Sequence, residues 1–138
     1  MAQAEELAYA IDSTTTSTRG HYNPGTVHEE YARSYISLGQ TQKALDYLDR
    51  AQQTLPPTRF WQLLVVTSRA EALVKGGEFR AGIELATEAA EQIRAAGIER
   101  YLERIYGIQQ YLDKLTREIG YFSMPLREIL DGGAYKEI

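Results

Sequence analysis

The feature that most constrains the fold of this chain is a spacing of small residues that occurs twice. In each copy, four small residues are separated by intervals of seven, five and seven. The first copy consists of Ala32, Gly39, Ala44 and Ala51, and the second of Ala70, Gly77, Gly82 and Ala89. Small residues at matched places in two antiparallel helices let the two backbones approach closely. The spacing therefore predicts two tight helical hairpins built on one plan.

The remaining sequence is also typical of helices. No stretch alternates apolar with polar residues long enough to indicate a strand, and most glycines and prolines fall between apolar-periodic segments. Thr26 and Glu29 have the spacing of a capping box, so a helix is expected to start at Thr26. Gly120 is expected to end the longest helix. The predicted helices cover residues 3–11, 26–38, 41–55, 58–75, 79–96, 98–119 and 124–130.

The first hairpin resembles the tetratricopeptide repeat (TPR) family. The residues that carry the resemblance are Ala32, Tyr35, Gly39, Ala44, Leu45, Leu48, Ala51 and Pro56. The second copy keeps Ala70, Phe79 and Ala89, and its period of 38 residues, from Gly39 to Gly77, exceeds the family's roughly 34. The resemblance implies an all-α fold, a right-handed α-solenoid of antiparallel helix pairs with a long C-terminal helix and a short capping tail.

A chain of 138 residues is expected to form one domain. Its predicted parts are an N-terminal half-repeat (3–11), a first repeat (26–56), a second repeat (58–96), a long terminal helix (98–119) and a tail (120–138). A short amphipathic helix persists only if its apolar face is buried. The tail is therefore predicted to fold back on the long helix through Phe122, Leu126, Ile129 and Leu130.

Composition and charge exclude several classes of function. Nineteen acidic and fifteen basic residues give a net charge of −4, which argues against direct nucleic-acid binding. The absence of cysteine excludes disulfides and thiolate metal sites. No apolar run approaches the roughly 20 residues that cross a bilayer, and residues 1–6 lack the basic region of a secretory signal. The expected location is the cytoplasm, without a membrane partner.

No catalytic, metal or cofactor site is predicted. Gly76-Gly77 and Gly132-Gly133 lack the lysine and the spacing of a phosphate-binding loop. The two histidines, His21 and His28, lie in a loop and on a helix without converging ligands, and ordinary surface and capping roles are expected for them. With no convergent set of acid, base and nucleophile, the chain is not expected to be an enzyme.

The resemblance implies that the first helix of each pair lines a concave groove that binds a protein or a peptide. A groove that mixes charge with apolar contact suits an extended peptide or a helix. Chaperone-binding members clamp a carboxylate with Lys and Asn, but Glu29, Arg33 and Ser68 stand at the matching places here, so chaperone tails are poor candidates. The predicted groove residues are Glu29, Arg33, Ile36, Leu64, Thr67, Glu71, Lys75, Tyr101, Arg104 and Ile108.

Two further hypotheses remain open from the sequence. Degenerate repeats followed by long helices are similar to the C-terminal regions of bacterial helix-turn-helix regulators, which implies a sensor or scaffold part of such a regulator. The alternative is a self-associating structural or assembly protein, with a homodimer as its simplest form.

Overall fold

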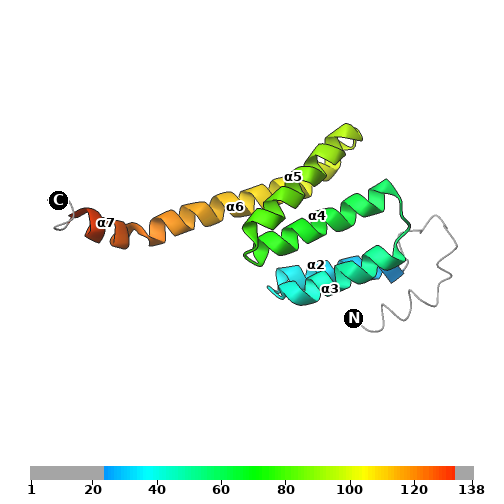
Figure 1. Cartoon of the computed structure of the whole chain (residues 1–138), viewed down its shortest axis with the longest axis horizontal. Coiled ribbons are helices and arrows are strands. Elements are labelled where there is room, and N and C mark those ends of the chain that lie inside the picture. The colour runs from blue at the N-terminus through cyan, green and yellow to red at the C-terminus, as the bar shows by residue number, and fades with distance from the viewer. Residues whose placement is uncertain (1–23, 133–138) are drawn as a thin grey trace. The chain divides into compact units, whose positions relative to one another are not determined.

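The computed structural model describes residues 24–132, and within them the chain is helical without a strand, as predicted (Figure 1). The predicted helix over residues 3–11 lies outside the described residues. The elements are α2 (Pro24–Ser37), α3 (Thr41–Thr54), α4 (Arg59–Lys75), α5 (Phe79–Ala95), the 3-10 helix η1 (Glu99–Tyr101), α6 (Leu102–Phe122) and α7 (Met124–Gly132). They divide into two compact units, with the boundary after Ile105 in α6.

The first unit contains both predicted hairpins, α2 with α3 and α4 with α5. The small residues of the first hairpin are buried as predicted, because Ala32, Ala44 and Ala51 have no exposed surface. They belong to one core cluster with larger apolar side chains of α2, α3 and α4. The cluster consists of Ala32, Ile36, Ala44, Leu48, Ala51, Leu55, Val65 and Ala72.

The second hairpin has an even closer backbone approach at Gly82. A Cβ atom on Gly82 would lie 2.6 Å from Cγ2 of Val74 and 2.8 Å from its backbone nitrogen. No side chain fits there without separating α4 from α5. Ala70 and Ala89 are fully buried on the same helix pair. In each hairpin three of the four small residues therefore mark helix contacts, whereas Gly39 and Gly77 are exposed in the turns between the helices.

The start of α2 differs from the prediction. The helix begins at Pro24, two residues before Thr26, and proline is favoured in a first helical turn because its missing N–H is not needed there. Glu29 does not close a capping box, since its carboxylate accepts a hydrogen bond from Ser68 of α4. The Glu29 side chain, which the local motif assigned to the start of its own helix, therefore binds Ser68 on another helix.

The second unit contains the rest of α6 and α7. The long helix passes through Gly120 and ends at Phe122, so the predicted stop at Gly120 is wrong. A glycine inside a helix costs only about 1 kcal/mol relative to alanine, which the surrounding helical turns can offset. The predicted short helix is present as α7, extending two residues past Leu130.

The predicted fold-back of the tail is wrong. Phe122, Leu126, Ile129 and Leu130 are between 48% and 75% exposed. Backbone hydrogen bonds of helical spacing meet at the turn residue Ser123, because its N–H donates to Ile119 O (2.9 Å) and the N–H of Arg127 donates to Ser123 O (3.0 Å). A chain that keeps this pattern does not make the reversal that a cap on α6 would require.

Candidate binding face

A cluster of polar and charged side chains connects α2, α4 and the first turn of α6. Glu29 is only 3% exposed, and its Oε1 accepts a hydrogen bond from Ser68 Oγ (2.7 Å). Arg104 donates from Nη2 to Ser68 Oγ (2.9 Å), and its Nη1 lies 3.5 Å from Glu29 Oε1. A buried carboxylate is unfavourable without such partners. The three side chains therefore stabilise each other only when all three helices are in place.

Arg104 extends this cluster toward the surface. Burial lowers the pKa of Arg104 from its ordinary value, and the carboxylates of Glu29 and Glu71 oppose that change. Glu71 Oε2 lies 3.9 Å from Arg104 Nη2, and Lys75 Nζ lies 3.7 Å from Glu71 Oε1. Charges therefore alternate from the buried Glu29 through Arg104 and Glu71 to the exposed Lys75.

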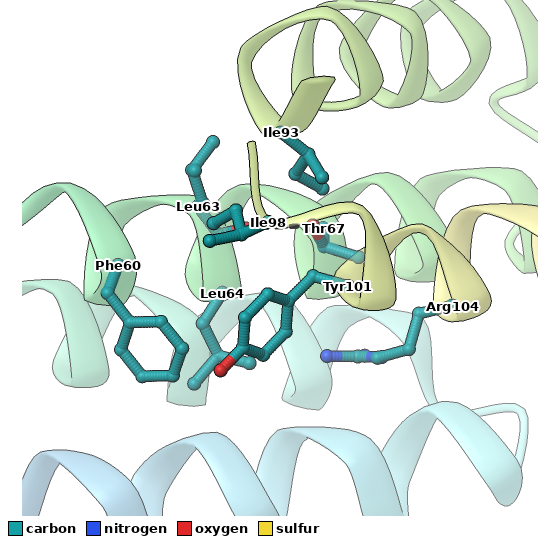
Figure 2. Close-up of a pocket in the computed structure, with 8 residues that line it drawn as sticks. All are labelled: Phe60, Leu63, Leu64, Thr67, Ile93, Ile98, Tyr101 and Arg104. Atoms are coloured by element: carbon teal, nitrogen blue, oxygen red, sulfur yellow. Dashed lines mark hydrogen bonds between the residues drawn. The ribbon is translucent and has the colours of Figure 1, made fainter. Parts of the chain in front are cut away.

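An apolar pocket lies beside this cluster, with Arg104 at one end of it (Figure 2). Figure 2 shows Phe60, Leu64, Tyr101 and Arg104 in a row along the pocket. The Phe60 and Tyr101 rings meet edge to face, with 5.3 Å between their centroids. The cavity volume is about 30 Å³, which exceeds the minimum needed to hold one water molecule. The complete lining is Phe60, Leu63, Leu64, Thr67, Ile93, Ile98, Tyr101 and Arg104.

A polar hollow lies between α2 and α4. Its volume is about 320 Å³, and Glu71 is the residue of α4 that lines it. The remaining lining residues come from α2 and are Glu30, Arg33, Ser34 and Ser37. Because Glu71 pairs with Arg104, this hollow and the apolar pocket are joined through one ion pair. We call the two together, with Lys75, the binding face.

The predicted groove residues fall into three groups. Arg33 and Lys75 are exposed and Leu64, Glu71, Tyr101 and Arg104 are half-buried, and the structure brings these six together on the binding face. Glu29, Ile36 and Ile108 lie beneath the surface and line neither hollow, and Thr67 is buried at the wall of the apolar pocket. Ile36 belongs to the core cluster, and the Thr67 hydroxyl donates to Leu63 O (2.8 Å). Ile108 belongs to the second unit.

The sequence missed three features near this face. Phe60 lines the pocket, but nothing in the helical spacing separates it from an ordinary α4 residue. His28 is 1% exposed rather than at the surface, with its ring centroid 6.0 Å from that of Tyr47. A second hollow of about 480 Å³ is lined by residues of α3, α4 and α5, among them Trp61 and Arg69, and by Pro57 in the connection between α3 and α4. The longer repeat period at Pro56-Pro57 is the signal that points to this hollow.

Within residues 24–132, no group of three His, Asp or Glu side chains is placed to hold a metal ion. His21 lies outside that range. None of the described helices combines the length and the apolar character needed to cross a membrane. Comparisons of the chain with family models, curated proteins and solved structures find no match. Function is therefore inferred from the binding face itself.

Proposed function

We propose that the first unit is a non-catalytic, TPR-like interaction module that binds an extended peptide or a helix of a partner protein. The observation that supports this function is the connection of an apolar pocket to a charged hollow by the Arg104–Glu71 pair. Peptide segments present apolar and charged side chains at short intervals, which a face of this composition can recognise. A sensor role in a bacterial regulator is one use of such a module that we propose.

The chemistry of the face restricts the partner. Arg33 is exposed at the polar hollow, where it suits an acidic side chain or a terminal carboxylate. The apolar pocket is small, with a volume of about 30 Å³, so it suits a short apolar side chain. Phe60 at its rim is 38% exposed and packs edge to face on Trp61 and Tyr101. The preferred ligand is therefore a peptide with an apolar anchor near an acidic group.

A peptide display library selected on the purified chain tests this proposal. Peptides that carry an apolar anchor and an acidic group are expected to be enriched, and their affinities can be measured by fluorescence polarisation. Arg33→Glu reverses the charge at the hollow and Leu64→Arg fills the pocket. Each change is expected to weaken binding by about tenfold or more.

Arg80→Glu is the matched control, because Arg80 is exposed on α5 and lies outside the binding face. It is expected to leave peptide affinity unchanged while making the same change in net charge. Selected peptides that bind Arg33→Glu and Leu64→Arg as tightly as the unmodified chain would contradict the proposal. Circular dichroism of each variant separates lost binding from lost folding.

A further inference from the structure

The apolar residues of α6 and α7 recur at alternating intervals of four and three residues. Starting at Ile108, the series is Leu112, Leu115, Ile119, Phe122, Leu126 and Ile129. This is the heptad spacing along which two helices pack side by side in a coiled coil. From Ile108 to Ile129 it covers three heptads, a length of about 32 Å at 1.5 Å per residue. We call these seven residues the heptad stripe.

The heptad stripe is buried at Ile108, half-buried at Leu112 and Leu115, and exposed to solvent in its C-terminal part. Ile119 is 58% exposed, and Phe122, Leu126 and Ile129 are each more than 60% exposed. An isolated apolar residue at a protein surface is ordinary, but four large ones in helical register form a continuous patch. Patches of this kind mark interaction surfaces, so the stripe has the character of an unpaired helix face.

The register of the heptad stripe survives the junction between α6 and α7. The backbone hydrogen bonds at Ser123 keep helical spacing on both sides of the break. Pro125 lies in the first turn of α7, where its missing N–H costs little. Phe122 and Leu126 therefore remain four residues apart in a nearly continuous helix, and the stripe does not rotate to another face.

We propose that the heptad stripe from Leu112 to Ile129 is a dimerisation seam that pairs with the same segment of a second copy of this chain. A second copy supplies a heptad series of equal length and phase, which an unrelated partner would have to match separately. The helical positions that flank the seam also permit self-pairing, because among them only Glu118 is charged. These flanking residues are Gln109, Tyr111, Thr116, Glu118, Ser123, Pro125 and Leu130. Two copies in register therefore place no like charges opposite each other.

Phe122 and Tyr121 provide a matched test of this seam. They are adjacent aromatic residues, 75% and 71% exposed, but only Phe122 lies on the heptad stripe. The full-length chain is expected to have about twice the 15.6 kDa of one chain in sedimentation equilibrium. Phe122→Glu is expected to raise the dimer dissociation constant on the order of 100-fold, because it places a charge in an apolar seam. Tyr121→Glu is expected to change it less than about threefold.

Leu126→Glu is a second seam variant that repeats the test one helical turn away. Circular dichroism is expected to show unchanged helix content in all three variants, since each changed residue is exposed. The full-length chain is measured over a 100-fold range of concentration that reaches on the order of 0.1 mM. If it is monomeric throughout that range, the proposal is overturned. Equal weakening by Tyr121→Glu and Phe122→Glu would also overturn it, because general stickiness rather than a heptad seam would then cause association. These outcomes do not depend on peptide binding by the first unit.

Discussion

The two units of this protein use apolar helical residues in opposite ways. In the first unit, residues as small as Ala32 and Gly82 lie at helix contacts, and the larger Leu48 fills the space between helices without any exposed surface. In the second unit, residues as large as Phe122 and Ile129 remain mostly exposed. Amphipathic periodicity is present in both, so periodicity alone does not tell which helix finds its partner within its own unit. Small residues at matched positions on two neighbouring helices do indicate such a partner.

The largest expected difference between the units comes from deleting a leucine side chain in each. Leu48→Ala is expected to lower the free energy of unfolding by about 2–5 kcal/mol, because Leu48 is fully buried in the core cluster. Leu130→Ala removes the same atoms from a half-exposed site and is expected to cost less than about 1 kcal/mol. Urea denaturation of dilute protein measures both. Similar losses would mean that the second unit is packed as tightly as the first.

Reversing the charge of Arg104 tests whether the buried cluster holds the first unit together. Arg104→Glu would place a third carboxylate beside Glu29 and Glu71 and is expected to cost about 2–4 kcal/mol. The sequence placed Arg104 in the predicted groove, but its side chain is only 23% exposed. Arg80→Glu, on the exposed surface of α5, is expected to stay within about 0.5 kcal/mol. An Arg104→Glu variant as stable as the Arg80→Glu variant would show that the cluster contributes no stability.

Adding volume at a hairpin contact sharpens the role of the small residues. Ala44→Leu is expected to cost roughly 1–3 kcal/mol, because Ala44 has no exposed surface and its helix cannot move away without disturbing Ala32 and Ala51. Ala95 is exposed near the end of α5, and Ala95→Leu is expected to change stability by less than about 0.5 kcal/mol. Negligible effects at both sites in urea denaturation would remove the interpretation of the spacing as a packing motif.

The smallest expected effect comes from removing the end of the second unit. A chain that ends after Gly120 lacks Tyr121, Phe122 and all of α7, whose apolar residues are exposed. At concentrations low enough to prevent association, its unfolding free energy is expected to stay within about 0.5 kcal/mol of the full chain. A clear loss of stability in dilute protein would show that this segment stabilises the first unit.

The sequence predicted those parts of the fold that depend on local patterns. The helices around Ala32, Ala44, Ala70 and Ala89 and the turns at their glycines follow from periodicity and from residue size. Glu29 could not be placed in the same way. Its partners, Ser68 and Arg104, are 39 and 75 residues away, and no local pattern distinguishes a buried carboxylate from a groove-lining one. The sequence therefore placed Glu29 and Ile36 among the groove residues, although both lie beneath the surface.

The tail shows the opposite kind of error. Leu126 and Ile129 were correctly placed on one helical face, and the short helix was expected to need a cover for that face. Sequence spacing could not decide whether that cover is the chain's own long helix. The decision depends on the backbone at Ser123, a single turn residue between α6 and α7 whose hydrogen bonds to Ile119 and from Arg127 keep the four-residue helical spacing. The prediction that Gly120 ends the long helix was wrong for the same reason, because the sequence alone does not show how the backbone continues.

The three glycines that end α2, α4 and α5 also bear on how fast this protein folds. Gly39, Gly77 and Gly97 have φ angles of 74°, 92° and 71°, a left-handed conformation that ends a helix within one residue. The two hairpins consequently close through short turns between neighbouring helices, and chains dominated by such local contacts fold in microseconds to milliseconds. The contact between Glu29 and Arg104 closes a far longer loop and is expected to form after the folding barrier. Its loss would then speed unfolding and leave the folding rate nearly unchanged.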